Sequence, residues 1–317
     1  MVNDSCSYSK VGFCLIKSLN NIFYIVYVRD SNNIIFFDLK NEQLISIIKD
    51  AHANNIDIIK YFQDKKNKRD ILLTSSSDAV KLWNLNNLKN FCYFDFSEKS
   101  NLKINKSCFL YFNNDINIVI KLTKLDKTEE FNQIYNLKRE KIKEIKDKNT
   151  KDSSYYLDCY YHNNISYLIS CSYNSIKVYN YNKNKWKIYS TDKVNECIQG
   201  FVITHIDNGA KIIGSSMDNI YLWNFQSGAL LNSIKGGSNR APFFALCLWN
   251  SDSFFIGRGG MLDLVKIKNN KLNVVKRLNE HNELIPCIKK ILHPIYGECL
   301  ISQDFKGIIK LWVNKNK

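Results

Sequence analysis

The feature that most constrains this chain is a short motif that recurs along its whole length. The clearest copies are residues 77–84, 217–224 and 307–312, in which a turn is followed by a strand that contains a tryptophan near its end. Equivalent positions recur at intervals of 42 to 52 residues, at Phe37, Trp83, Tyr135, Tyr179, Trp223, Val265 and Trp312. A strand–turn–strand repeat of this length is typical of propeller blades rather than of helical repeats. Seven copies predict a closed, seven-bladed β-propeller.

The segments between these positions have the composition of short strands. Residues 22–28, 167–171, 211–214 and 253–256 are β-branched or aromatic runs, and clusters of Asn, Asp, Gly and Ser separate them. Almost no segment sustains a helical period. Residues 137–148 are compatible with a short helix, but they fall where the third blade requires its outer strand, and we favour the strand. The predicted fold class is therefore all-β.

The two ends of the sequence suggest how the ring closes. The sequence ends five residues after Trp312, which leaves the last blade without a fourth strand. Residues 6–10 have the composition of that outer strand, and residues 11–19 have the composition of the first strand of blade one. This interlock would remove the open edges of a linear array. We therefore expect residues 1–317 to form a single propeller domain whose last blade is closed by the N-terminal strand.

Composition limits the class of protein. The formal net charge is +15, and the basic residues are mostly lysines spread through residues 60–68, 138–151 and 183–193. Lys, Asn, Ile, Tyr and Phe are enriched together, as AT-rich coding produces without selection for binding, so we favour a solvated basic surface over a nucleic-acid site. No segment resembles a secretory signal or a membrane span. We expect a cytoplasmic protein, with the nucleus as the alternative, and no stable membrane insertion.

The sequence contains no recognisable catalytic or cofactor motif. It has no phosphate-binding loop, nucleophile elbow, zinc-protease motif or dinucleotide fingerprint. The 5 histidines are dispersed and the 10 cysteines form no CxxC pair, so we expect reduced, structural cysteines and no metal. The glycine-rich residues 236–238 and 257–260 are interpreted as hairpin turns. We expect neither enzymatic activity nor a cofactor.

The repeat resembles the WD-repeat β-propeller family over essentially the whole chain. In that family each blade carries a His before its first strand, a hydroxyl residue in the second, an Asp in the next turn and a Trp in the third. His52 precedes Trp83 by 31 residues, and His281 precedes Trp312 by the same 31. The resemblance implies a hydrogen-bonded structural staple in two blades. Its residues are His52, Thr74, Asp78, Trp83, His281, Ser302 and Trp312. Lys306 stands where the second staple would have its Asp.

The resemblance also implies a function. The family is dominated by non-catalytic scaffolds and recognition subunits, and this is an argument from fold analogy. We expect a protein–protein interaction scaffold within a larger assembly, with other proteins as its partners. The alternative is an RNA-associated subunit, of the ribosome-biogenesis or RNA-processing type, that uses the basic surface.

One face of the predicted propeller is the expected place for partners. It is lined by the loops that join the outer strand of one blade to the first strand of the next. The candidate partner-binding residues in these loops are Asn54, Asn55, Asp57, Asn239, Arg240, Asn282 and Glu283. Arg240 ranks first because arginine is enriched among the energetic anchors of interfaces. The lysines are expected to scatter around the perimeter and to add only non-specific attraction.

Overall fold

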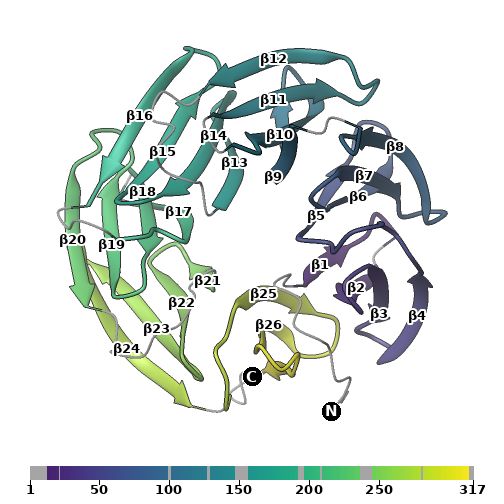
Figure 1. Cartoon of the computed structure of the whole chain (residues 1–317). Coiled ribbons are helices and arrows are strands. Elements are labelled where there is room, and N and C mark those ends of the chain that lie inside the picture. The colour runs from purple at the N-terminus through teal and green to yellow at the C-terminus, as the bar shows by residue number, and fades with distance from the viewer. Residues whose placement is uncertain are drawn as a thin grey trace.

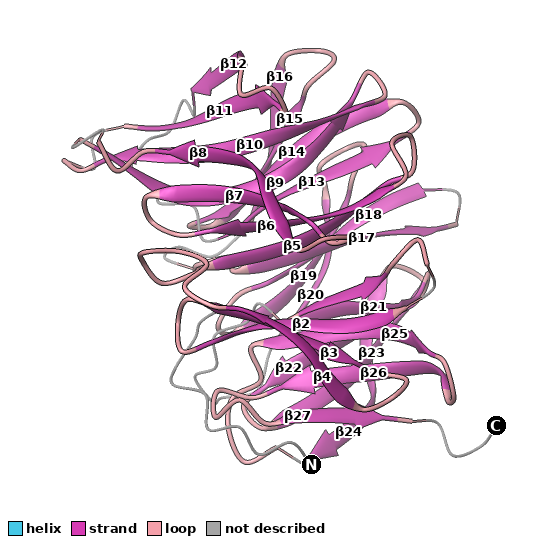
Figure 2. Cartoon of the chain, turned by 90° about the vertical axis from the view of Figure 1, so that its right-hand side faces the viewer, coloured by secondary structure: helices cyan, strands magenta, loops and turns pink. Residues whose placement is uncertain are grey.

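The protein is built from strands and loops alone in the part of the chain that the structure describes (Figure 2). The structure is a computed structural model, and it describes residues 13–20, 22–98, 101–126, 129–146, 156–191, 196–207, 209–235, 245–279 and 281–313. Within these ranges, no helix has the length and apolarity of a membrane span. Figure 1 shows seven sheets around a common axis, with the first strand of each nearest the axis. The predicted all-β, seven-bladed propeller is confirmed.

Consecutive antiparallel strands build each blade. Blade 1 consists of β1 (Cys14–Lys17), β2 (Phe23–Arg29), β3 (Asn33–Asp38) and β4 (Gln43–Ile48). Blade 2 consists of β5 (Ile58–Asp64), β6 (Arg69–Ser75), β7 (Ala79–Asn84) and β8 (Lys89–Asp95). Blade 3 consists of β9 (Leu102–Phe112), β10 (Asp115–Lys124), β11 (Glu130–Asn136) and β12 (Lys141–Lys146). Blades 4 and 5 consist of β13 (Tyr156–His162), β14 (Ile165–Ser172), β15 (Ser175–Asn180), β16 (Lys185–Ser190), β17 (Gly200–Ile206), β18 (Gly209–Ser215), β19 (Asn219–Asn224) and β20 (Leu230–Lys235). Blades 6 and 7 consist of β21 (Leu246–Asn250), β22 (Ser253–Arg258), β23 (Met261–Lys268), β24 (Lys271–Asn279), β25 (Cys287–His293), β26 (Gly297–Gln303) and β27 (Ile309–Trp312).

Two of the strand predictions concerned uncertain segments. Residues 137–148 contain β12, which pairs with β11, so the strand interpretation is confirmed. Residues 11–19 contain β1, the first strand of blade 1. Residues 6–10, predicted to complete the last blade, lie outside the described residues, and blade 7 has three strands among those that are described.

Burial explains why the middle strands are apolar throughout. Almost every residue of β6 and β22 is buried, because neighbouring blades cover both faces of these strands. Outer strands such as β4 have one face in solvent and are largely exposed. Apolar residues on both faces therefore mark a middle strand, and polar residues on one face mark an outer strand.

The core is a series of apolar layers between adjacent blades. Leu72 and Trp83 of blade 2 pack with Val26 of blade 1. Ile25 of blade 1 packs in turn with Ile301 of blade 7, so a layer of the same kind joins the two ends of the described chain. Because no blade buries both of its faces alone, the blades depend on one another for stability.

A bulge marks the repeat position in most blades. The register between the third and fourth strands shifts immediately before one residue of the motif in blades 1, 2, 3, 5 and 6. These residues are Phe37, Trp83, Tyr135, Trp223 and Val265. A bulge increases local twist and re-aims side chains. Shared bulges show that the positions aligned by sequence are structurally equivalent.

Asparagine pairs close several of the tight turns. The two-residue loops Asn113–Asn114, Asn163–Asn164 and Asn269–Asn270 each join consecutive strands, and all six residues have φ between 49° and 60°. Positive φ at both central residues is the geometry of a type I′ hairpin turn. Asn adopts this region more readily than most residues, so asparagine occupies positions where glycine is often found.

Candidate interaction site

The two ends of the blades form two different surfaces. We call the end that carries the outer-to-inner connections and the second-to-third-strand turns the loop face. We call the opposite end, which carries the first-to-second and third-to-fourth-strand turns, the hairpin face. Because the strands of each sheet are antiparallel and consecutive, these turns alternate between the two ends.

Blade 2 contains a buried chain of hydrogen bonds near the loop face. Trp83 Nε1 donates to Thr74 Oγ1 at 2.8 Å, and the same hydroxyl lies 2.8 Å from His52 Nε2. His52 Nδ1 lies 2.9 Å from Ser76 Oγ, which donates to Asp78 Oδ1 at 2.9 Å. The structure brings the four predicted residues together, but it places Ser76 between the imidazole and the carboxylate. Sequence reasoning missed this member, whose only signal is its position two residues after Thr74.

The imidazole of this network is neutral at pH 7. Burial lowers the pKa of His52 to about 4, with Lys81 acting in the same direction and Asp78 opposing it. A neutral imidazole has one donor and one acceptor nitrogen, and both are hydrogen-bonded here. Neither nitrogen is left over for a metal ion or a substrate proton.

Blade 7 repeats the network with a different carboxylate. Trp312 Nε1 donates to Ser302 Oγ at 2.7 Å, and His281 Nε2 lies 2.7 Å from the same hydroxyl. His281 Nδ1 lies 3.1 Å from Asp304 Oδ2. Lys306 stands at the position of Asp78, as the sequence indicated, and sequence reasoning missed Asp304. Asp304 stands at the position of Ser76 in blade 2, so its carboxylate reaches the imidazole directly.

Blade 5 has glycine where blades 2 and 7 have the hydroxyl. A Cβ at Gly214 would lie 2.9 Å from the side chains of both Ile176 and Trp223. The indole thus occupies the space that the hydroxyl group would need. Trp223 Nε1 instead donates to the carbonyl oxygen of Ser190, in the outer strand of blade 4, at 3.0 Å.

Blades 3 and 6 contain buried ion pairs, which sequence reasoning missed. Lys121 Nζ lies 2.9 Å from Glu130 Oε2, and the two side chains are 1% and 6% exposed. In blade 6 Asp263 accepts two hydrogen bonds from Arg277, at 2.7 and 3.1 Å. Arg258 Nη1 lies 3.5 Å from the same carboxylate. Arg258 therefore belongs to the core of the blade, although it falls in residues 257–260, which the sequence suggested to be a turn.

The candidate partner-binding residues that the structure describes lie on the loop face. Asn54 Nδ2 donates to Asp78 Oδ1 at 2.8 Å, which links the face to the staple of blade 2. Glu283 Oε1 lies 2.6 Å from Lys306 Nζ. The exposed residues Asn55, Asp57 and Asn282 have no such neighbour described, and Asp57 also lines the central cavity. Asn239 and Arg240 lie outside the described residues.

In the part of the chain that the structure describes, the turns and connections of the loop face expose mainly acidic residues, although the chain as a whole is basic. Its exposed acidic residues in connections and turns are Asp30, Asp50, Asp57, Glu98, Asp126 and Asp218. Exposed lysines among its described turn residues are Lys49 and Lys306, and Lys306 already pairs with Glu283. Large apolar side chains are exposed between the acidic groups, at Leu125, Tyr173, Met217 and Ile308.

The described turns of the hairpin face expose mainly basic residues. Its exposed basic turn residues are Lys40, Lys65, Lys66, Lys68, Lys138, Arg139 and Lys183. Its exposed acidic turn residues in the described ranges are Glu42, Glu140 and Asp207. The expected scatter of lysines around the perimeter did not include this separation of the described turn residues by charge. This separation of acidic and basic turns is not evident in the sequence, because consecutive turns lie on opposite faces.

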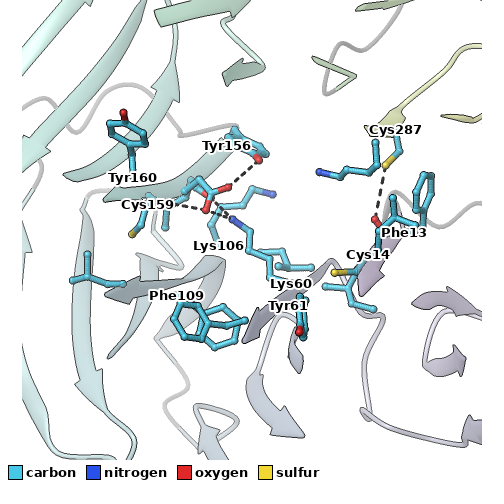
Figure 3. Close-up of a pocket in the computed structure, with 18 of the residues that line it drawn as sticks. Phe13, Cys14, Lys60, Tyr61, Lys106, Phe109, Tyr156, Cys159, Tyr160 and Cys287 are labelled. Atoms are coloured by element: carbon cyan, nitrogen blue, oxygen red, sulfur yellow. Dashed lines mark hydrogen bonds and ion pairs between the residues drawn. The ribbon is translucent and has the colours of Figure 1, made fainter. Parts of the chain in front are cut away.

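A cavity of about 650 Å³ lies at the axis, lined mainly by β1, β5, β9, β13 and β25 (Figure 3). Lys60 Nζ lies 2.7 Å from Asp158 Oδ1, and Tyr156 donates to Asp158 Oδ2 at 3.2 Å. Burial raises the pKa of Tyr156 to about 12, so its phenol is neutral at pH 7. Among the described residues no group of three metal-ligating side chains exists. Within this arrangement Asp158 is paired with Lys60, while Lys106 and Lys289 also line the cavity.

The cysteines that the structure describes are free thiols. Two of them meet between the first strands of blades 3 and 4, where the Sγ atoms of Cys108 and Cys159 are 3.4 Å apart. Burial raises the pKa of Cys159 well above its usual value. A thiol of this kind is protonated at neutral pH and is a poor nucleophile.

Comparisons with known proteins identify the fold. No protein-family model and no curated protein sequence matches the chain. A chain of the mitotic checkpoint complex matches with a TM-score of 0.71 and 10% identity, over 97% of this chain and 91% of that one. The β-propeller domain of Cps50 (Swd1) from Myceliophteria thermophila matches with a TM-score of 0.69 and 13% identity, over 99% and 98%. BBS1N, crystallised with ARL6DN, matches with a TM-score of 0.72 and 8% identity, over 99% and 95%. The chain is similar in fold to these proteins, and the likeness at such identities shows a β-propeller.

Proposed function

We propose that the protein is a non-catalytic interaction scaffold, a divergent member of the WD-repeat family, whose loop face binds a basic segment of a partner protein. The observation that carries this proposal is the excess of exposed acidic residues in the described turns and connections of the loop face, on a chain of net charge +15. Charge drift alone would make both faces basic. A face of opposite sign to the rest of the molecule favours one orientation of a charged partner during encounter.

The exposed apolar side chains supply the second component of an interface. Leu125, Tyr173 and Met217 are 59%, 38% and 49% exposed and lie in equivalent turns of three successive blades. Apolar groups between charged ones give the mixed surface that protein interfaces use, in which burial contributes affinity and charge contributes specificity. A basic partner segment that also carries apolar residues fits this surface.

The structural neighbours support a scaffold role by analogy alone. One is a chain of a mitotic checkpoint complex, and another was crystallised in complex with ARL6DN. These statements concern those proteins, and fold does not determine function. They favour protein partners over RNA, which none of the neighbours' descriptions mentions.

Charge reversal on the loop face tests the proposal. The double variant Asp57→Lys/Asp218→Lys removes two exposed carboxylates that have no ion-pair partner among the described residues. The matched control is Glu42→Lys/Glu140→Lys, which makes the same change of charge on the hairpin face. Tagged proteins are recovered from the native cell with and without nuclease treatment, and co-purifying proteins are identified by mass spectrometry.

We expect the loop-face variant to lose its specific partners while the control retains them, with both variants melting like the wild type. Those partners should survive nuclease treatment. Loss of partners after nuclease alone would favour the RNA-associated alternative. Equal recovery by both variants and the wild type would show that the loop face is not the binding surface.

A further inference from the structure

A second cavity, of about 690 Å³, opens on the hairpin face between blades 2 and 3. Its lining runs from the inner strands β5 and β9 to the outer strand β12, and it includes the turns at residues 65–67 and 137–138. The residues that matter below are Phe62, Lys65, Lys66, Tyr111, Lys138 and Ile142. We call this cavity the basic groove. It extends along the radius of the blade, so its shape suits an extended ligand.

The lysine ammonium groups that line the basic groove outnumber the carboxylates that pair with them. Lys65 and Lys138 are exposed, and neither has an ion-pair partner among the described residues. Lys66 Nζ lies 2.8 Å from Asp115 Oδ1, but these side chains are 63% and 68% exposed. Exposed pairs of this kind contribute little and exchange partners readily. The buried carboxylate of Asp64 is held by Arg69 Nε at 2.8 Å and adds no free negative charge.

The floor of the basic groove is aromatic and apolar. The rings of Phe62 and Tyr111 are stacked, with centroids 6.1 Å apart, and Tyr161 meets Tyr111 edge-on at 5.1 Å. At the walls Tyr161 and Ile142 remain 43% and 50% exposed. Apolar surface flanked by lysines matches a ligand that is apolar and anionic at once.

We propose that the basic groove binds an acidic, amphipathic segment of a partner polypeptide. Carboxylates of the segment pair with Lys65, Lys66 and Lys138, and its apolar side chains cover Tyr161 and Ile142. A single-stranded nucleic acid needs free aromatic faces on which bases stack. The groove's rings are packed against one another, Phe62 stacked on Tyr111 and Tyr161 edge-on to Tyr111, rather than spaced to receive successive bases, which favours the polypeptide.

This inference is independent of the function proposed for the loop face. The two surfaces lie at opposite ends of the blades and have opposite charge, so a segment attracted by one is repelled by the other. With both surfaces occupied, the propeller holds an acidic and a basic partner at the same time. Either surface can fail its test without affecting the other.

Fluorescence anisotropy with the full chain tests the basic groove. The probe is a fluorescein-labelled dodecapeptide of alternating Glu and Leu, and the matched peptides replace Glu by Gln or by Lys. The groove variant is Lys65→Glu/Lys138→Glu. The control is Lys40→Glu/Lys183→Glu, which makes the same change of charge in turns of blades 1 and 4 on the same face. Tyr161→Ala tests the apolar component, and a labelled oligouridylate tests the nucleic-acid alternative.

We expect the Glu–Leu peptide to bind the wild type, and the groove variant to bind it about tenfold more weakly or worse, since reversed charges repel the carboxylates. The control should change affinity by less than about threefold, because charges beyond about 8 Å are screened at physiological salt. Tyr161→Ala should weaken binding several-fold without changing its salt dependence.

Three results would overturn the proposal. Equal losses in the groove and control variants would show a diffuse field without a site. Tighter, groove-dependent binding of the oligouridylate would identify a nucleic-acid surface. Salt-sensitive self-association of the wild type in sedimentation, abolished by the groove variant, would show that the acidic loop face of a second copy is the occupant.

Discussion

Blades 2 and 3 solve the same packing problem with different chemistry. In blade 2 the motif residue Trp83 pairs with Leu72 of β6, and in blade 3 the motif residue Tyr135 pairs with Ile118 of β10. Thr74 and Ile120 each lie two residues after these partners, so the two positions are equivalent. Blade 2 therefore faces blade 1 with a hydrogen-bonded hydroxyl, whereas the layer that blade 3 presents to blade 2 is largely apolar, with the buried Ser107 opposite Ile120.

Blade 3 places its buried polar groups on the opposite side. Val119 belongs to the layer between blades 3 and 4, and Lys121 follows it by two residues on the same face of β10. The ion pair of Lys121 with Glu130 therefore points towards blade 4. The comparison teaches that the propeller does not require the staple in every blade. In blade 3 the buried charges of Lys121 and Glu130 compensate each other without a tryptophan or a histidine.

Breaking the ion pair of blade 3 should have the largest effect. Glu130→Ala leaves the ammonium of Lys121 buried without its carboxylate, which should cost about 3–5 kcal/mol of unfolding free energy. Urea unfolding followed by tryptophan fluorescence measures it. The double variant Lys121→Met/Glu130→Leu should recover most of the loss, because two apolar side chains leave no buried charge. A loss below about 1 kcal/mol in the single variant would mean that solvent reaches Lys121.

Exchanging the chemistry of the two blades should have intermediate effects. Thr74→Val leaves Trp83 Nε1 and His52 Nε2 without their shared partner and should cost about 1–3 kcal/mol. Ile120→Thr makes the reverse change in blade 3 and should also destabilise, because its hydroxyl enters an apolar layer. Thermal and urea unfolding of the two variants measure both losses. If Thr74→Val unfolded like the wild type, the network of blade 2 would have no structural role.

Acid should have the smallest effect, a loss of unfolding free energy that arises from the staple histidine of blade 2. The pKa of His52 is about 4 in the fold, below its ordinary value of 6.5, so unfolding takes up a proton at mildly acidic pH. Its contribution is fully present above pH 6.5 and is lost as the pH falls towards 4. Between pH 7 and pH 5.5 the loss should be about 1 kcal/mol.

The measurement compares the wild type with His52→Gln at each pH. The difference between their unfolding free energies should shrink as the pH falls over this range, because only the wild type has the imidazole to protonate. A difference that stays constant would mean that His52 is already solvated, and a difference that grows would reverse the sign of its pKa shift.

The fold could be predicted from the sequence because its signal is repeated. The motif recurs in every blade, with an aromatic residue in six of the seven, so the degenerate copy at Val265 is located by its neighbours. The ion pair could not be predicted, because Lys121 and Glu130 belong to no recurring motif and each resembles a surface residue. Asp304 of blade 7 was missed for a related reason. It stands at the position of Ser76, whereas the motif has its Asp two residues later, where Lys306 stands.

The opposite charges of the two faces also escaped sequence reasoning. Charge along the chain alternates with each turn, and a linear count such as the block at residues 60–68 averages over both ends of a blade. Only the antiparallel order of the strands sorts Asp57 from Lys65, which are eight positions apart and lie at opposite ends of β5.

The asparagine pairs have a consequence for the order of folding. A two-residue type I′ turn fixes the register of its hairpin locally, and hairpins form in about 1–10 μs, before contacts distant in the chain. Asn113–Asn114, Asn163–Asn164 and Asn269–Asn270 therefore give blades 3, 4 and 6 their own nuclei. Contacts of high sequence separation, such as those between Ile25 and Ile301, form slowly because a long loop must close first. We expect the ring to assemble blade by blade and to meet at blades 1 and 7 last.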